Sequence, residues 1–168
     1  TLSSSSAASD VYKRQADARR DPNFLIMART DIRAVEGFES AIDRAKALVD
    51  AGADAVFPEA MRTLAEFEAM ASALAVPILA NMTEFGKSDL FSVDQLRDAG
   101  VNMVIWPVSL LRIAMGAAGR ALDTLNEEGH LTSKLGEMQH RADLYDLIDY
   151  ESYKQFDSGV AGFTVTKE

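Results

Sequence analysis

Phe24-Leu25-Ile26-Met27-Ala28, followed directly by Arg29-Thr30-Asp31, is the stretch of sequence that decides the fold. The apolar run is short, and it lies between Asp21-Pro22 and a polar triplet. A continuous run of this length is typical of a strand that is buried on both faces, as strands of parallel sheets are. The stretch therefore predicts a parallel sheet, provided that the pattern recurs along the chain.

The same pattern recurs three times downstream. Short apolar runs at residues 53–57, 76–80 and 101–106 predict three more strands. Apolar residues at helical spacing predict helices over 38–49, 64–74 and 93–99, and Ser109 begins a long helix that runs to about Glu128. Strand and helix thus alternate regularly, which is the signature of parallel βα units.

The expected fold class is α/β, namely the C-terminal half of a (β/α)8 TIM-type barrel, followed by C-terminal helices. A complete barrel needs about 250 residues and eight βα units, and this chain supplies about half of them. A flavodoxin-like open sheet is the alternative, but it usually has a fifth strand and a glycine-rich phosphate loop, which the sequence lacks. Because half a barrel leaves strand edges and an apolar interior uncovered, we expect that the chain cannot bury its core alone.

Three segments follow from this organisation: 1–15, 16–130 and 131–168. Residues 1–15, TLSSSSAASDVYKRQ, are serine-rich and are expected to be disordered. They could be a native linker or a cloning or sequencing remnant; we favour a remnant, because the next residues begin in the middle of a structural unit. Residues 16–130 are the half barrel. An apolar, aromatic pattern over 133–156 predicts one or two further helices that pack on the outside or on another subunit, and 157–168 shows no strong pattern.

Composition narrows the function classes. The net charge of −9 argues against nucleic acid as a partner, since a phosphate backbone attracts basic surfaces. The absence of cysteine excludes disulfides and thiolate chemistry within this chain. No apolar run approaches the roughly 20 residues of a membrane span, and no signal peptide is apparent. We therefore expect a cytoplasmic protein with no membrane partner.

Polar residues follow each predicted strand, where the active site of a barrel lies. The candidates are Arg29, Thr30, Asp31, Glu59, Asn81, Thr83, Glu84, Ser109 and Arg112. Each also has an ordinary structural interpretation. Arg29 and Asp31 could form a local ion pair, Glu59 could be a charge at a helix N-terminus, and Asn81 and Thr83 could be loop and cap residues. His130 and His140 lie outside the strands and are expected at the surface or an interface.

A family resemblance is carried by five segments in order: IMARTD (26–31), VFPEA (56–60), VPILANMTEFG (76–86), WPVSLLRIA (106–114) and MQHRADLY (138–145). Together they resemble the methylisocitrate lyases of the isocitrate lyase and phosphoenolpyruvate mutase superfamily. The match covers nearly everything from Ala16 to Tyr153. The resemblance implies Mg²⁺-dependent cleavage of 2-methylisocitrate to pyruvate and succinate, in propionate breakdown.

The resemblance also implies roles for individual residues. Arg29 would clamp a substrate carboxylate, and Glu59 would act beside the metal, through bound water rather than as a direct ligand. Further contacts to the small di- or tricarboxylate substrate would come from Asn81, Met82, Thr83, Arg112 and Arg141. Phe57 and Ile105 would form pocket walls small enough to leave room for the extra methyl group, which is worth about 1–3 kcal/mol in a fitted pocket. The family forms homotetramers by exchanging C-terminal helices.

Other parts of the family's site have no counterpart in this sequence. Its general acid is a cysteine in a Lys-Lys-Cys-Gly-His type loop, and its principal magnesium-binding aspartates precede the segments found here. We therefore expect the chain as given to be catalytically inactive. The alternatives are a related superfamily enzyme, such as isocitrate lyase, oxaloacetate decarboxylase or hydrolase, or a phosphoenolpyruvate mutase-like enzyme, and a non-enzymatic truncated barrel piece.

Overall fold

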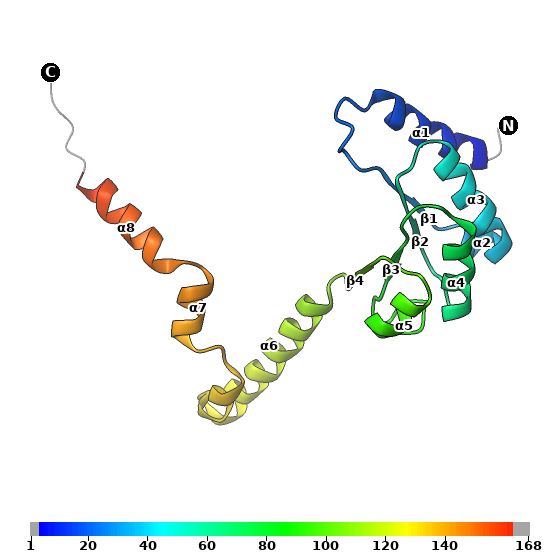
Figure 1. Cartoon of the computed structure of the whole chain (residues 1–168). Helices are drawn as coiled ribbons and strands as arrows, with labels where there is room; N and C mark the ends of the chain where they lie inside the picture. Colours follow the sequence, from blue (N-terminus) through cyan, green and yellow to red (C-terminus); the bar gives the residue numbers. More distant parts are fainter. Residues whose placement is uncertain (1–3, 163–168) are drawn as a thin grey trace, which may run out of the picture. The chain divides into compact units, whose positions relative to one another are not determined.

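The computed structural model describes residues 4–162, which divide into two compact units, Thr1–Ile113 and Ala114–Glu168. The first unit holds α1 (Ser4–Ala18), β1 (Met27–Thr30), α2 (Arg33–Glu36), α3 (Phe38–Asp50), β2 (Ala55–Pro58), α4 (Leu64–Ala73), β3 (Leu79–Asn81), α5 (Val93–Asp98) and β4 (Met103–Ile105) (Figure 1). Helix α6 (Ser109–Glu128) begins in the first unit and continues into the second. The second unit also holds the 3-10 helix η1 (Thr132–Glu137), α7 (Arg141–Leu147) and α8 (Tyr150–Ala161).

The four strands follow one another in parallel. Strand β1 pairs with β2, with Met27 opposite Ala55, and β3 pairs with β4, with Leu79 opposite Met103. A parallel bridge between Val56 and Ile78 joins the two pairs. The predicted alternation of strands and helices is therefore confirmed, and the first unit is an α/β structure.

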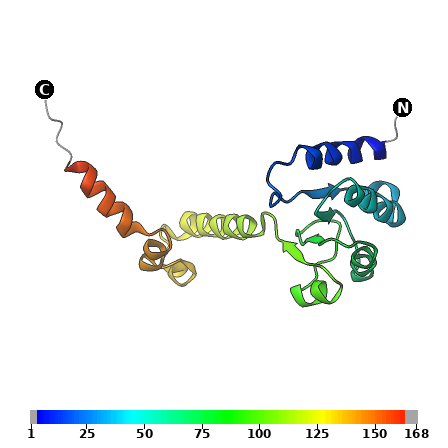
Figure 2. The same ribbon diagram turned by 45° about the horizontal axis from the view of Figure 1, so that its top comes forward.

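The helices α3, α4 and α5 contribute to a core on one face of these strands (Figure 2). Its largest fully buried side chains include Phe67 and Met70 of α4 and Leu96 of α5, packed with Val56 and Ile78 from the strands. Side chains alternate between the two faces of a strand. Residues on the other face are therefore free of these helices, and this alternation decides which side chains form the candidate site.

The strands begin later than predicted. Phe24 and Leu25 were expected to lie in a strand buried on both faces, but their exposed fractions are 64% and 55%. Ladder pairing begins only at Met27, opposite Ala55. Burial in this region requires both a paired neighbouring strand and a covering helix, and hydrophobicity alone does not report either.

The helix boundaries agree closely with the sequence pattern. Ser92 and Gln95 form a reciprocal capping box at the start of α5, and Thr63 caps α4 by accepting a hydrogen bond from the backbone N–H of Glu66. Gly52 follows α3 with φ of 102°, a left-handed conformation that glycine adopts without steric cost.

The expectation of disorder over residues 1–15 is wrong for the described part of that segment, because Ser4–Ala18 form α1. Alanine, lysine, arginine and glutamine are good helix formers. Tyr12 packs against a small buried cluster of Ala28, Leu48 and Ala53, which supplies the tertiary contact that the sequence pattern did not reveal. Residues 1–3 lie outside the described residues.

The second unit has more helix than predicted. Helices were expected over 133–156, whereas α8 continues to Ala161, and the remainder of the predicted tail lies outside the described residues. Tyr145 and Tyr150 stack with ring centroids 4.4 Å apart, yet large apolar side chains of α7 and α8, such as Leu147 and Phe156, stay exposed. Among the described helices, none combines the length and apolar character needed to cross a membrane.

A half-buried ion pair ties α2 to the start of α4. Arg33 Nη2 lies 2.6 Å from Glu66 Oε1, and the backbone N–H of Arg62 donates to Glu66 Oε2 at 2.7 Å. Burial alone raises the pKa of Glu66, but the hydrogen bonds from Arg33 and Arg62 outweigh it and hold this pKa below its ordinary value. The carboxylate therefore stabilises the folded state.

We predict that Glu66→Gln, made in a protein in which this chain is joined to the barrel half expected to precede it, lowers the free energy of unfolding by about 2 kcal/mol at pH 7, because a charged hydrogen-bond acceptor is lost. A folded pKa below the unfolded one gives stability that is present above the unfolded pKa and is lost as pH falls through the folded pKa. Urea denaturation followed by circular dichroism should therefore show a lower free energy of unfolding for Glu66→Gln than for the unmodified protein at pH 7. This difference should disappear as the pH is lowered. Glu68→Gln, on an exposed position of the same helix, is the control. Equal effects of both changes would contradict the assignment.

Candidate active site

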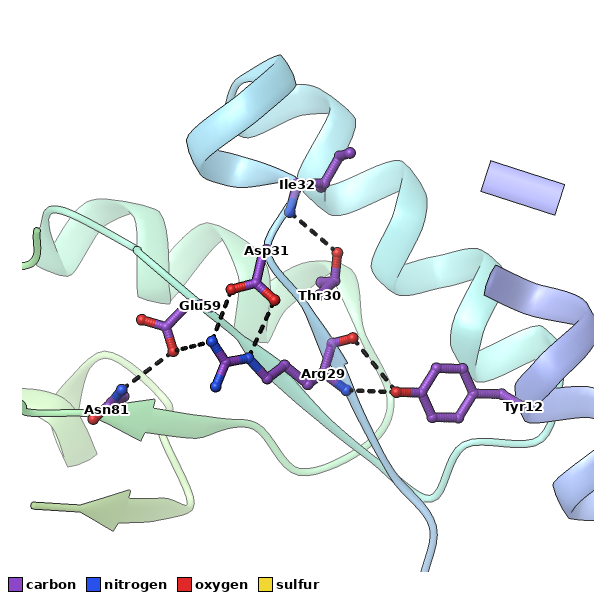
Figure 3. A network of polar contacts seen from close by, with 7 residues as sticks. All are labelled: Tyr12, Arg29, Thr30, Asp31, Ile32, Glu59 and Asn81. Carbon is purple, nitrogen blue, oxygen red and sulfur yellow. Dashed lines mark hydrogen bonds and ion pairs between the residues drawn. The ribbon is translucent and has the colours of Figure 1, made fainter. Parts of the chain in front are cut away.

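Arg29 lies on the strand face away from the helices, and carboxylates hold its guanidinium group (Figure 3). Its Nη2 and Nε donate to the two oxygens of Asp31, at 2.8 and 3.2 Å. Nη2 also lies 3.5 Å from Glu59 Oε2, and the guanidinium carbon lies 5.0 Å from the centre of the Phe57 ring. The hydrogen bond from Arg29 lowers the pKa of Asp31, and the same bond raises the pKa of Arg29. Both groups are charged at neutral pH.

Strand register explains why these residues meet. Arg29 is the ladder partner of Phe57, and Asn81 is the partner of Ile105. Glu59 comes two residues after Phe57 and therefore points to the same side, and its backbone N–H donates to the Thr30 carbonyl at 2.9 Å. Successive parallel strands thus bring their carboxyl ends to one edge of the sheet.

Asn81 joins this network from β3. Its Nδ2 donates to Glu59 Oε2 at 3.2 Å, which fixes the orientation of the amide (Figure 3). Its Oδ1 is buried and has no hydrogen-bond partner within the described part of the chain. A buried acceptor without a donor is costly. This orientation presents an acceptor that suits a hydroxyl group or a water molecule, and the predicted contact of Asn81 with the substrate stays a prediction.

A second cluster forms after β3 and at the start of α6. Arg112 Nη1 donates to the backbone carbonyl of Glu84 at 2.8 Å and lies 3.4 Å from both Thr83 Oγ1 and Glu84 Oε2. Ser109 donates to the same carboxylate oxygen at 2.7 Å. The hydrogen bond from Ser109 is the main cause that lowers the pKa of Glu84.

Some of the predicted site residues contact one another in the structure, and others do not. It brings Arg29, Glu59 and Asn81 into one network and joins Thr83 to Arg112. Phe57 lies against the Arg29 guanidinium. Ile105, on β4, is partly exposed and lies opposite Asn81 of β3. Arg141, the first residue of α7, belongs to the second unit, and its part in the site stays a prediction.

The Met82 side chain lies in the core, and the predicted contact between Met82 and the substrate stays a prediction. Met82 is 1% exposed and belongs to the core cluster, and its sulfur accepts a hydrogen bond from the Phe91 backbone N–H at 3.4 Å. Asn81 and Thr83 lie on the site face, so the residue between them must turn toward the helices. The Met82 backbone N–H is also occupied, by the carbonyl of Ile105 at 2.9 Å.

Three residues of these networks were not assigned a functional role from the sequence, namely Asp31, Glu84 and Ser109. All three were visible as polar residues after strands, and Asp31 was weighed as a local ion-pair partner, which the structure confirms. No local pattern indicates that the Glu84 carboxylate reaches Ser109, because 25 residues separate them.

The described residues do not form a complete metal site. No group of three or more histidine, aspartate or glutamate side chains gathers in residues 4–162. Glu59 and Asp31 both flank Arg29, whose positive charge already offsets one of their two negative charges. A divalent cation prefers several oxygen ligands together. Glu59 and Asn81 could at most contribute to a site whose other ligands come from elsewhere.

The charge balance of the two clusters has a consequence for anion binding. Arg29 and Arg112 face the carboxylates of Asp31, Glu59 and Glu84, so these groups together carry one net negative charge. The two arginines can still orient a carboxylate through their remaining donors. They cannot by themselves supply the positive potential that a di- or tricarboxylate needs.

The contact between Asn81 and Glu59 gives a test. Asn81→Asp should place two carboxylates within about 3 Å and raise the apparent pKa of the pair by more than one unit, since like charges disfavour joint ionisation. Carbon-13 NMR titration of the side-chain carboxyl groups measures this shift. Asn102→Asp is the control, because Asn102 accepts a hydrogen bond from the Ile78 backbone N–H, which favours the ionised form. A normal titration for residues 59 and 81 would show that they do not meet.

Comparison with known proteins shows which protein family this chain resembles. The family model described as "Phosphoenolpyruvate phosphomutase" matches residues 1–126. The chain is 51% identical over 142 residues to "Probable 2-methylisocitrate lyase 2" of Corynebacterium glutamicum, which covers 84% of this chain and 46% of that protein. It is 47% identical over 146 residues to 2-methylisocitrate lyase of Escherichia coli, which covers 87% of this chain and 49% of that protein. The chain thus spans about half the length of the curated relatives it matches.

A solved structure agrees with these relatives. The structure of oxaloacetate acetylhydrolase in complex with the product oxalate aligns with a TM-score of 0.81 and 26% identity, over 96% of this chain and 56% of that chain. The resemblance to methylisocitrate lyases that the five sequence segments carry is confirmed by these matches. The family match over residues 1–126, the parallel βα units and the shared fold lead to one conclusion: the chain belongs to the phosphoenolpyruvate phosphomutase family.

Proposed function

We propose that this chain is part of a carbon–carbon lyase that cleaves 2-methylisocitrate to pyruvate and succinate. The observation that carries the proposal is the meeting of Arg29, Glu59 and Asn81 at the carboxyl ends of three successive parallel strands. Identities of 47% and 51% to 2-methylisocitrate lyases support this choice of reaction over other carboxylate chemistry.

The proposal includes the fold of the whole protein, in which these strands form the C-terminal half of an eight-stranded barrel. Within the described residues, β1 pairs only with β2, and β4 pairs only with β3. A single bridge, between Val56 and Ile78, joins the two pairs. The helices cover one face, and the opposite face carries the site residues, as the interior end of a barrel does. The missing strands would close both edges and surround Arg29 and Asn81.

The bond that breaks joins the carbon bearing the hydroxyl group to the neighbouring carbon of the succinate half. The hydroxyl proton leaves, a carbonyl forms, and the electron pair of the broken bond moves to the succinate carbon, which then takes a proton. Arg29 would orient a carboxylate through the donors that Asp31 does not use, and Asn81 Oδ1 would accept from a hydroxyl group or water. Fixed donors and acceptors lower the barrier because they need no reorganisation during the reaction.

Mg²⁺ would serve as Lewis acid and template for the hydroxy-acid end of the substrate. Its principal ligands would come from outside the described part of the chain, consistent with the incomplete oxygen set there. The added cation would also offset the net negative charge of the five charged side chains. The proton donor would likewise come from elsewhere, since the sequence contains no cysteine.

The intact protein would assemble with copies of itself. Apolar side chains on α7 and α8 are exposed, including Leu147, Tyr153 and Phe156. A homotetramer that exchanges C-terminal helices, as the resemblance implies, would cover them. Arg141, the first residue of α7, stays a proposed contact of the substrate in the intact protein.

The first test restores the preceding coding region, or joins the whole chain to the first half of the E. coli relative. This protein should release pyruvate from 2-methylisocitrate, measured through coupled oxidation of NADH by lactate dehydrogenase. Arg29→Ala should reduce kcat/KM by about a hundredfold or more, because a positioned charge and hydrogen-bond donor is lost. Arg97→Ala, an exposed arginine of α5, is the matched control. Unchanged turnover in Arg29→Ala would refute the clamp, and preferential turnover of isocitrate or oxaloacetate would redirect the proposal to those substrates.

The chain by itself should show no lyase activity and should associate, because a parallel edge and apolar side chains stay uncovered. Gel filtration and circular dichroism of the purified chain measure this. Mixing with the first half of the E. coli relative should yield a discrete complex and measurable pyruvate release. A cooperatively folded monomer that stays soluble alone would contradict the half-barrel proposal.

A further inference from the structure

Glu84 links two substrate-facing segments that are distant in sequence. Its Oε2 accepts a hydrogen bond from Ser109 at 2.7 Å, and Ser109 is buried at the start of α6. Its backbone carbonyl accepts from Arg112 Nη1 at 2.8 Å, and Oε2 lies 3.4 Å from the same nitrogen. One residue therefore holds both the beginning of the helix and the arginine one turn further along it.

The contacts occupy only part of the Arg112 guanidinium. Within the described part of the chain, its hydrogen bonds all use Nη1, to Glu84 and Thr83. The face of the group lies over the Phe85 ring, 5.5 Å from its centre. The N–H groups of Nη2 and Nε therefore stay available to an external carboxylate. Because the guanidinium group is planar and is held at Nη1 and against the Phe85 ring, these N–H groups point in a defined direction.

Backbone conformation indicates that these contacts hold the two segments. Phe85 and Val108 both adopt positive φ, 63° and 57°. Non-glycine residues rarely do so, and a β-branched residue such as valine is a genuine outlier. Such a conformation is unfavourable and persists only where surrounding contacts impose it. The two residues adjoin Glu84 and Ser109, so the strained positions flank the hydrogen bond between them.

We infer that Glu84 is a positioning residue that orients the Arg112 guanidinium toward a substrate carboxylate, and that Ser109 orients Glu84. The inference rests on the proposed function, since Arg112 is expected to bind the acid substrate. Glu84 does not contact substrate in this assignment. Its effect comes from ordering a long, flexible side chain before substrate arrives, so that substrate binding no longer carries the entropic cost of ordering it.

The experiment compares Glu84→Ala, Glu84→Gln, Ser109→Ala and Arg112→Ala in the restored protein. Glu84→Ala should raise KM for the cleaved acid by about fivefold to tenfold with kcat changed less than about twofold, as expected for lost ordering before binding. Glu84→Gln keeps an oxygen acceptor for Ser109 and Arg112, so it should restore KM to within about threefold of the unmodified protein. Ser109→Ala should raise KM in the same direction, and Arg112→Ala should raise it most.

Controls separate positioning from stability. Asp94→Asn removes a carboxylate that pairs with Arg97 on the surface of α5, and it should leave KM and Tm unchanged. Glu84→Ala with a lowered Tm but unchanged KM would show a purely structural tie and overturn the inference. Equal impairment in Glu84→Gln and Glu84→Ala would also overturn it, since charge rather than orientation would then matter.

Failure of the proposed function gives a different result. If the restored protein does not cleave 2-methylisocitrate, the reaction assignment fails, and the same variants are compared by calorimetry for their Kd toward succinate and oxalate. Weaker binding in Glu84→Ala that Glu84→Gln restores would still support the inference. Binding that is unaffected by Arg112→Ala, or no binding of either acid, would overturn it.

Discussion

The parallel pairing of β1 with β2 and of β3 with β4, with the described helices α3, α4 and α5 packed on one face, is the constraint on which the rest of the structure depends. The pairing sets Arg29 opposite Phe57 and Asn81 opposite Ile105, and alternation along each strand then assigns every residue to a face. Side chains that turn toward the helices, such as Met82, build the core. Side chains that turn the other way meet at one edge of the sheet. A slip of one residue in any strand would exchange the two sets.

The site that results is strongly polar, but its two arginines and three carboxylates together carry one net negative charge. Each arginine is already held by carboxylates, Arg29 by Asp31 and Glu59, and Arg112 by Glu84. Such pairs fix the direction of a guanidinium group while reducing its attraction for another anion. This arrangement suits a site in which geometry comes from these strands and the missing positive charge comes from a metal ion with other ligands. Asn81 Oδ1, a buried acceptor without a donor in the described residues, agrees with that division.

Much of the fold could be predicted because its signals are local. Ser109 and Glu128 were placed correctly as the ends of α6, and the helix predicted over 38–49 agrees with α3, since caps and apolar spacing act within a few residues. The strand starts were placed too early, because Phe24 and Leu25 are apolar yet have no paired neighbour. Helix α1 was missed, because its packing through Tyr12 depends on residues of β1 and α3.

The sequence by itself determined the α/β class, the order of the βα units, the family resemblance and the positions of Arg29, Glu59, Asn81 and Arg112 at or beyond the carboxyl ends of successive strands. These depend on residue type, spacing and order, which the chain carries directly. Only the tertiary structure decided that Asp31 and Glu84 hold the two arginines, that Met82 faces the core, and that the Asn81 amide points its nitrogen at Glu59. Such contacts join residues on different elements or depend on which face of a strand is covered, and neither is set by a side chain's nearest neighbours in sequence.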